Sequence, residues 1–247
     1  MIVRSHDYVE YCRETATNLE TLHDLALRGA GKQETTIAVN QHIVEEVALR
    51  ASDDLIDIGC GDGTLLRLAA KVGVRNAIGY LATEEEATLV RATGLDVRQA
   101  YSDRLPAPDA SASVVVCNNV LLIVPREKVL PSLREMHRVA RPGARIFVGE
   151  IPFVPGPPPE PQFDSSLETL AYLRRTHGLR ACLGMARRMI YWKLTGKPMV
   201  IRDGNQVSFH ATAEEFLALA GEAGLIPVRH WRHDDPDTRN NFLFTKA

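Results

Sequence analysis

The feature that most constrains the fold is a glycine-rich turn between an apolar run and an amphipathic segment. It reads Leu55-Ile56-Asp57-Ile58-Gly59-Cys60-Gly61-Asp62-Gly63-Thr64-Leu65-Leu66. Glycines allow a tight turn and let a ligand approach backbone amides without a Cβ in the way, and the N-terminus of a following helix presents free N–H donors. The pattern predicts a strand, a cradle for a polar ligand and a helix. The alternative interpretation is a tight connection that binds no ligand.

After Leu55 the sequence alternates short apolar runs with helical segments, which is typical of a parallel sheet covered by helices. The predicted strands lie near residues 54–58, 77–81, 95–99, 113–118, 144–151, 225–230 and 240–245. The predicted helices between the first five strands lie near residues 64–72, 83–92 and 126–140. Thr83 precedes three glutamates and so has the features of a helix N-cap. These elements predict an α/β fold with one seven-stranded, Rossmann-like sheet.

Two further regions accompany this predicted core. Residues 1–50 show helical spacing of apolar residues and are expected to form an N-terminal helical lid. Residues 152–207 hold a proline-rich connector, which excludes helix and central strand, followed by a basic helical insert. Thr212 is expected to cap a further helix. The core itself is assigned to residues 51–151 and 208–247.

The glycine spacing narrows the kind of ligand. It is GxGxG rather than the GxGxxG of dinucleotide sites, and Asp57 lies two residues before the first glycine. Leu105-Pro106-Ala107-Pro108-Asp109 and Arg141-Pro142-Gly143 follow in the chain. In this order the three segments resemble those of class I methyltransferases that use S-adenosylmethionine (SAM) and release S-adenosylhomocysteine (SAH). A nicotinamide dehydrogenase is disfavoured by the glycine spacing and by the absence of an acid at the end of the second strand.

The resemblance implies which residues hold SAM. Asp57 is expected to organise the turn or meet the amino group of the ligand, and the amides of the turn are expected to face its methionine portion. Asn118 is expected to offer its backbone carbonyl. The predicted cofactor-binding set is Asp57, Gly59, Cys60, Gly61, Asp62, Gly63, Leu81, Glu84, Tyr101, Ser102, Asp103, Asn118 and Asn119.

Three positions depart from the family pattern. Leu81 stands where family members usually carry an acid that accepts both ribose hydroxyls, and its loss removes hydrogen bonds worth about 1.5–3 kcal/mol. Tyr101 and Ser113 replace two further acids. Glu84 or Glu85 is a candidate to reach back toward the ribose, with stabilisation of the helix dipole as the alternative role. Tyr101 is expected to stack on the adenine ring.

Methyl transfer from a sulfonium depends on alignment and a dry site more than on acid–base chemistry. A hydroxyl acceptor benefits from a general base near neutral pKa, and histidine suits that role. His210 is the first candidate, followed by His23 and His177, with packing or capping as the alternative role. Cys60 is assigned a structural role because no paired base is evident.

The predicted function is methyl transfer to a small-molecule or sugar-type acceptor, at oxygen. Arg187 and Arg188 of the insert and Tyr11 of the lid are the candidate acceptor contacts. The default interpretation of the two arginines is a solvated basic face on a lid helix. The alternatives are contact with an anionic acceptor, such as a phosphorylated or nucleotide-linked sugar or a lipid-linked precursor, and contact with nucleic acid. The alternatives are a degenerate binding or scaffold protein and an enzyme that uses a SAM-like ligand for non-methyl chemistry.

Charge and composition restrict the partners. The formal net charge of -2 gives no overall electrostatic reason to bind nucleic acid. No apolar run reaches the roughly 18 residues of a membrane span, although contact of the insert with a membrane surface stays open. The four cysteines are dispersed without metal-ligand spacing, so no metal is expected. We expect a cytoplasmic protein, and the sequence does not predict its oligomeric state.

Overall fold

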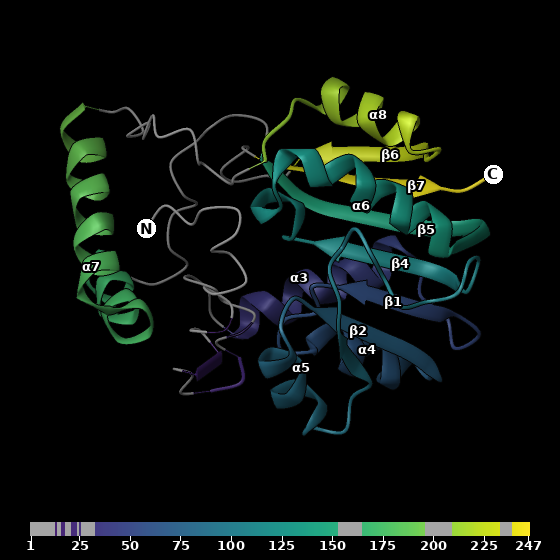
Figure 1. Ribbon diagram of the computed structural model, residues 1–247, viewed down its shortest axis with the longest axis horizontal. Helices are drawn as coiled ribbons and strands as arrows, with labels where there is room; N and C mark the ends of the chain where they lie inside the picture. The colour runs from purple at the N-terminus through teal and green to yellow at the C-terminus, as the bar shows by residue number, and fades with distance from the viewer. Residues whose placement is uncertain are drawn as a thin grey trace.

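The computed structural model describes residues 13, 16–17, 21–23, 25, 33–152, 165–195, 209–232 and 239–247. One seven-stranded sheet with the order β3-β2-β1-β4-β5-β7-β6 forms its centre (Figure 1). The strands are β1 (Asp54–Ile58), β2 (Asn76–Leu81), β3 (Val97–Gln99), β4 (Ala112–Asn118), β5 (Ala140–Pro152), β6 (Ile226–Arg232) and β7 (Arg239–Thr245). β7 is antiparallel to both of its neighbours, and the other pairs are parallel. The predicted α/β, Rossmann-like fold is confirmed.

Helices cover both faces of the sheet. They are α3 (Gln33–Glu46), α4 (Thr64–Val72), α5 (Glu84–Arg91), the short 3-10 helix η1 (Leu121–Ile123), α6 (Arg126–Val139), α7 (Ser166–Thr195) and α8 (Ala213–Glu222). Side chains of α3, α4 and α5 pack in one apolar cluster with Leu55 and Val114. Side chains of α6 and α8 pack in a second cluster with Ile56 and Val115. Adjacent residues of one strand thus enter opposite clusters, as the two-residue period of a strand requires.

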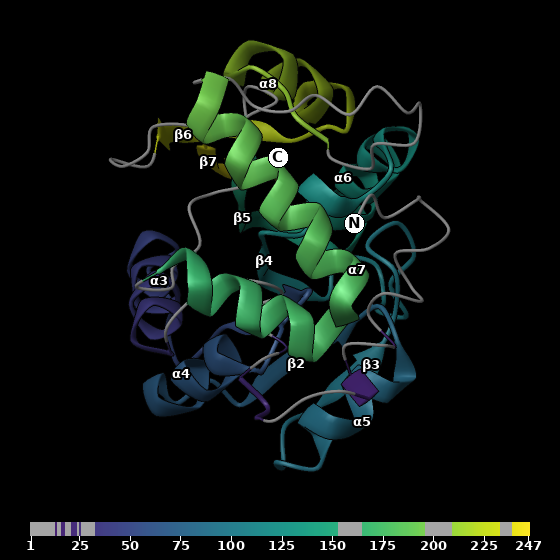
Figure 2. The same ribbon diagram turned by 90° about the vertical axis from the view of Figure 1, so that its left-hand side faces the viewer.

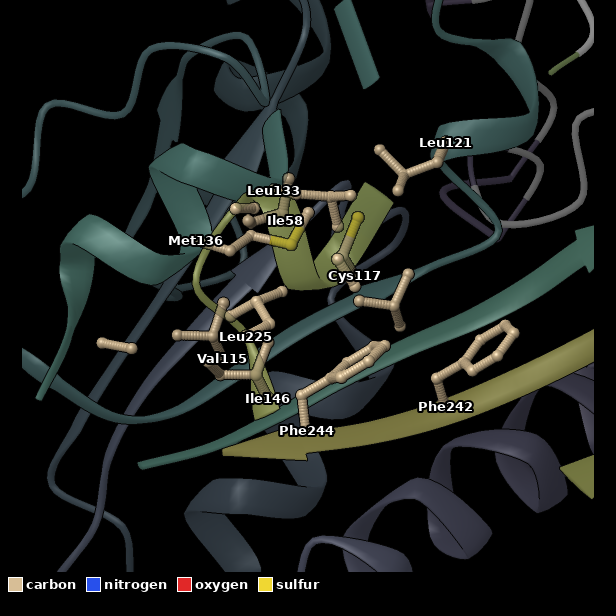
Figure 3. Close-up of a cluster of buried hydrophobic side chains, with 14 of the residues drawn as sticks. Ile58, Val115, Cys117, Leu121, Leu133, Met136, Ile146, Leu225, Phe242 and Phe244 are labelled. Atoms are coloured by element: carbon tan, nitrogen blue, oxygen red, sulfur yellow. The ribbon is translucent and has the colours of Figure 1, made fainter. Parts of the chain in front are cut away.

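Figure 3 shows the second cluster, in which Met136 and Leu133 of α6 meet Val115 and Ile146 of the sheet. Phe242 and Phe244 extend it along β7, and both are fully buried. Apolar burial of this kind contributes about 25 cal/mol per Å². These two clusters pack against both faces of the central strands, so the carboxyl ends of β1, β4 and β5 have fixed positions at one edge of the sheet.

Local signals in the sequence set the helix boundaries. The Thr83 side chain accepts a hydrogen bond from the Glu86 amide at the start of α5. Thr212 and Glu215 form a capping box at the start of α8. Both predicted N-caps are therefore confirmed.

β5 begins earlier than the sequence pattern predicted. It starts at Ala140, which pairs with Ala112 of β4, whereas the apolar run begins at residue 144. The Gly143 amide donates to the Lys246 carbonyl, so the Arg-Pro-Gly segment is held against the residues that follow β7. Backbone hydrogen bonds there extend the strand without apolar side chains, and α6 ends at Val139.

The insert helix α7 lies on the side where the parallel strands end (Figure 1), and Figure 2 shows it crossing in front of that edge. Gly178, with φ 78, interrupts its helical geometry. Three apolar side chains of α7, those of Leu179, Leu183 and Ile190, are 61%, 60% and 58% exposed. In the described part of the chain, no helix is both long and apolar enough to cross a membrane.

Candidate functional site

The glycine-rich turn leaves the carboxyl end of β1 and opens α4. Gly59, Gly61 and Gly63 have φ values of 73, 54 and 81, in the left-handed region that favours glycine. A Cβ on Gly59 would lie 2.2 Å from Cγ2 of Val120, in the loop after β4. The turn therefore needs glycine both for its backbone angles and for its close packing beside β4.

The backbone donors of the turn divide into two groups. The amides of Gly59 and Cys60 donate to the Tyr80 carbonyl of β2, at 2.8 and 3.2 Å, and the Gly63 amide donates to the Cys60 carbonyl. Among the described residues, no acceptor is found for the amides of Gly61 and Asp62. Backbone amides normally find a partner when they are not solvated. The donors open to a ligand are thus at the apex of the turn.

Asp57 lies beneath this apex with 4% of its surface exposed. Burial raises the pKa of its carboxyl to about 7, and the charge of Asp62 adds to the effect. A carboxyl in this state gains from a positive partner, because an opposite charge favours its ionised form. The ammonium group expected of the ligand has the required charge.

Asp62 connects the turn to two other segments. Its Oδ1 accepts hydrogen bonds from the amide and the hydroxyl of Thr64, at 2.8 and 2.7 Å, and so orders the first turn of α4. Its Oδ2 lies 2.9 Å from Nδ1 of His23. Because an ionised carboxylate only accepts, Nδ1 is the donor, and among described residues the buried Nε2 has no partner. His23 therefore links residues 21–23 to the glycine-rich turn.

The end of β2 offers no carboxylate. The Leu81 side chain is 1% exposed and packs in the apolar cluster that covers the α3, α4 and α5 face. Glu84 is bound to Arg91 and Thr88 of its own helix. Glu85 pairs with Arg13 at 2.8 Å. In this structure neither glutamate is directed to the ribose position, and that role stays a prediction.

The loop after β3 carries the three residues that were predicted to contact adenine. Tyr101 is 47% exposed, which leaves its ring accessible for stacking. The Ser102 hydroxyl lies 2.8 Å from that of Ser132, and Asp103 binds Lys128 at 2.5 Å, so both side chains turn toward α6. Of these three side chains, Tyr101 is the one placed to meet a ligand.

Ser113 lies at the opposite edge of the sheet, near the start of β4. Its hydroxyl donates to Asp53 at 2.7 Å and accepts from the Asp54 amide at 3.0 Å. The position thus ties the amino ends of β1 and β4 together. Ser113 was predicted to lie where strand four opens, and the structure places it there, as the second residue of β4 and a strand length away from the glycine-rich turn.

A polar group that the sequence analysis missed lies at the ends of β4, β5 and β7. Arg239 donates to Glu150 at 2.8 Å and to Asn119 at 3.1 Å. The Glu150 amide donates to the Asn241 side chain at 2.9 Å. Asn119 and Glu150 have φ values of 58 and 65. For residues other than glycine such angles cost about 1–2 kcal/mol each, and they cluster at functional sites.

A pocket of about 220 Å³ adjoins this group, between α3 and the sheet edge. Glu150, Asn118 and Asn241 line it, together with the apolar ring of Phe147. The remaining lining residues belong to α3 and are Ala38, Val39, His42 and Ile43. The cavity is therefore mostly apolar with a few polar groups at one end, as small-molecule sites usually are.

His210 and Cys60, the remaining histidine and cysteine discussed as candidates, lie in different surroundings. His210 lies between two residues that are fixed by backbone hydrogen bonds. The Phe209 amide donates to Leu122 in η1, and the Ala211 amide donates to Pro152 at the end of β5. His210 thus lies at the same edge as the turn. Burial raises the pKa of the Cys60 thiol well above its usual value, which fits a structural role.

Four predicted acceptor-site residues belong to the N-terminal region and the insert. Tyr11 lies outside the described residues, and the side chains of His177 and Arg188 in α7 do too. Arg187 is exposed on α7. Their predicted roles stay predictions. Among described residues, no group of three or more metal-ligating side chains is found.

Comparison with known proteins identifies the core. Residues 56–148 match a family described as "Methyltransferase domain". The 27-O-demethylrifamycin SV methyltransferase of Amycolatopsis mediterranei (strain S699) is 34% identical over 133 residues, which are 51% of this chain and 48% of that relative. The chain thus matches about half of the length of this curated relative.

Solved structures share the fold over nearly the whole chain. Magnesium protoporphyrin IX methyltransferase from Synechocystis PCC 6803 with bound SAH has a TM-score of 0.57, 14% identity and coverage of 99% of this chain and 96% of its own. The [4+2]-cyclase SpnF has a TM-score of 0.59, 15% identity and coverage of 98% and 94%. At these identities the likeness shows the fold alone.

The residues at the turn fit SAM, the cofactor of this family. The apex amides of Gly61 and Asp62 and the buried Asp57 carboxyl suit its carboxylate and ammonium groups. The turn thus has groups that match the methionine portion of SAM. At the ribose position, Leu81 stands in place of the usual carboxylate, so the match is weaker there. The family match over residues 56–148, the sheet order and the glycine-rich turn together make the core of this chain similar to class I SAM-dependent methyltransferases.

Proposed function

We propose that the protein transfers a methyl group from SAM to a hydroxyl of a small-molecule acceptor. The observation that carries the proposal is the turn at the end of β1. There, left-handed glycines, the buried Asp57 and two apex amides with no acceptor among the described residues lie together. The turn is placed at the carboxyl edge of the sheet, where open α/β folds bind ligands.

The chain's own residues would hold the cofactor from three directions. The Asp57 carboxylate would accept from its ammonium group, and the apex amides of Gly61 and Asp62 would donate to its carboxylate. The Tyr101 ring would stack on its adenine. When bound, SAM supplies a methyl group on an already activated leaving group. The protein's task is then to align an acceptor oxygen and exclude water.

Two observations support a small-molecule acceptor. The curated relative is named for methylation of 27-O-demethylrifamycin SV, and a mostly apolar pocket of about 220 Å³ lies beside Glu150. His210, at the same sheet edge, is the candidate general base. The proposal also includes the division of the chain into lid, core and insert. It further includes binding of an anionic acceptor by Arg187 and Arg188, and a cytoplasmic location.

The test is transfer of isotopically labelled methyl from SAM to a panel of hydroxylated small molecules, with products analysed by mass spectrometry. The proposal expects a product heavier by one methylene group, formed together with SAH in equal amount. SAH formation without a methylated product, or product without SAH, would contradict it.

A second candidate function is use of a SAM-like ligand without methyl transfer. The buried Leu81 favours it, because a site without the ribose carboxylate departs from the family pattern. The fold is compatible with such chemistry, as its likeness to a cyclase illustrates. Conversion of an acceptor with SAM left unconsumed would decide for this candidate.

A further inference from the structure

Positive charge is concentrated in the insert. Residues 169–202 contain eight lysines and arginines and no aspartate or glutamate, although the whole chain has a formal net charge of -2. The eight residues are Arg174, Arg175, Arg180, Arg187, Arg188, Lys193, Lys197 and Arg202. Helix α7 occupies most of this segment. A segment with charges of one sign attracts anionic partners.

An exposed apolar stripe runs along the part of α7 that follows the interruption at Gly178. It consists of Leu179, Leu183, Ile190 and Leu194, which are 61%, 60%, 58% and 80% exposed. At 3.6 residues per turn, these four positions fall within about 60° of one another around the helix axis. Large apolar side chains gathered on one exposed side mark a contact surface. We call these four residues the α7 stripe.

A different side of the same helix is partly covered by the rest of the chain. Cys182, Met185 and Met189 are partly buried. Their positions lie roughly 115° around the helix axis from the α7 stripe. The helix itself lies beyond the edge where the parallel strands end (Figure 2). The α7 stripe is therefore open to an external partner while another side of the helix packs against its own chain.

Cations border the α7 stripe on both sides. Arg180 and Arg187 lie about 50–70° from its centre on one side, and Lys193 lies about 70° from it on the other. All three residues are exposed. In peripheral membrane helices, apolar side chains enter the acyl boundary while lysines and arginines reach the headgroups. The arrangement in α7 has this form.

The charges and the α7 stripe together select the partner. Two copies of this chain would bring their basic segments together, which like charges disfavour. Nucleic acid would pair with the cations but leave the apolar side chains in water. An anionic bilayer matches both features, because its headgroups attract cations and its acyl boundary accepts apolar side chains.

We propose that α7 is a docking helix that lays the α7 stripe on the surface of an anionic lipid bilayer. Arg180, Arg187 and Lys193 lie at the headgroups in this arrangement. The inference goes beyond the proposed function and does not depend on methyl transfer.

The test is co-sedimentation of the full chain with lipid vesicles. One set of vesicles contains phosphatidylcholine alone, and the other contains phosphatidylcholine and phosphatidylglycerol in about a 2:1 ratio. The wild type is expected to bind the anionic vesicles at least about tenfold more tightly than the neutral ones. Added salt should weaken this binding because it screens the cations.

One pair of variants tests the apolar contact. Leu183→Gln/Ile190→Gln keeps the charge of the helix and should weaken binding to anionic vesicles by about tenfold or more. The matched control is Val228→Gln in β6, because Val228 is 60% exposed, as Leu183 is. The control should bind as the wild type does.

A second pair tests the cations. Arg180→Gln/Lys193→Gln should weaken binding to anionic vesicles by about tenfold and leave binding to neutral vesicles unchanged. The control, Arg98→Gln/Arg134→Gln, removes the same charge from exposed positions on the core and should bind as the wild type does. Thermal unfolding and SAH affinity of each variant show whether the fold is intact.

Equal binding to both kinds of vesicle, or binding to neither, would overturn the inference. Wild-type binding by folded Leu183→Gln/Ile190→Gln would also overturn it. Sedimentation equilibrium tests the alternative occupant: self-association that this variant loses, without vesicle binding by the wild type, would assign the α7 stripe to a second copy of the chain. Vesicle binding requires neither SAM nor an acceptor, so its failure differs from failure of the proposed function.

Discussion

Asp57 and Asp62 lie on either side of the first two glycines of the turn, and the charge of Asp62 adds to burial in raising the pKa of Asp57 to about 7. Asp62 is occupied with Thr64 and His23, so its charge is stabilised by hydrogen bonds. In the fold without a ligand, burial therefore makes ionisation of the Asp57 carboxyl unfavourable. A ligand ammonium group would favour the ionised carboxylate and so lower the pKa of Asp57 again.

Asp57→Asn should change the pH dependence of stability. The folded-state pKa of Asp57 lies above its unfolded value of 3.8, so its stabilising contribution is present below that value and is lost as pH rises through about 7. Between about pH 4 and pH 8 the wild type should lose roughly 3–4 kcal/mol of unfolding free energy relative to the variant. Urea unfolding across this pH range measures the difference.

Asp54→Asn is the control for that experiment. A hydrogen bond from Asn76 lowers the pKa of Asp54, and Arg141 lowers it further. Its stabilising contribution is therefore lost as pH falls, which is the opposite direction to Asp57. A difference between wild type and Asp57→Asn that stays constant with pH would contradict the raised pKa of Asp57.

Ser113→Ala should affect folding and leave cofactor binding intact. Burial alone would raise the pKa of Asp53, but hydrogen bonds from Ser113 and Arg145 lower it. Removing the hydroxyl should cost about 1–2 kcal/mol of stability. SAH affinity, measured by calorimetry, should match the wild type because the residue lies at the amino edge of the sheet. A tenfold loss of SAH affinity in the folded variant is the opposing result.

Leu81→Asp should fail to restore a ribose contact. The side chain is 1% exposed within an apolar cluster, and an unpaired buried charge costs about 3–5 kcal/mol. The variant should unfold at lower temperature without gaining SAH affinity, whereas Leu81→Met, which keeps the volume, should cost less than about 1.5 kcal/mol. Wild-type stability together with tenfold tighter SAH binding would show that the aspartate reaches the ribose.

The core was predictable because its elements carry local signals. Apolar runs, the glycine-rich turn and the N-caps at Thr83 and Thr212 define the strands and helices with only short-range information. β5 was placed to begin at residue 144 rather than at Ala140, because its first residues pair through the backbone and carry no apolar pattern. Pairing across the sheet decides that boundary.

The Glu150 group was missed for a related reason. Arg239 and Glu150 are far apart in the chain and meet only because β7 returns antiparallel to β5, which pairs Arg239 with Pro152. A signal was available in Glu150 itself, as a charged residue within the apolar run that ends β5.

The most direct test of the central claim is calorimetric titration of the wild type, Gly61→Val and Gly143→Val with SAH. Gly61 and Gly143 have φ values of 54 and 74, so both substitutions strain a left-handed position, but Gly143 lies at the opposite edge of the sheet with nothing within 4 Å of an added Cβ. We predict that the wild type and Gly143→Val bind SAH and that folded Gly61→Val does not. Absent binding to the folded wild type, or equal binding by all three proteins, would contradict the assignment of the turn as the SAM site.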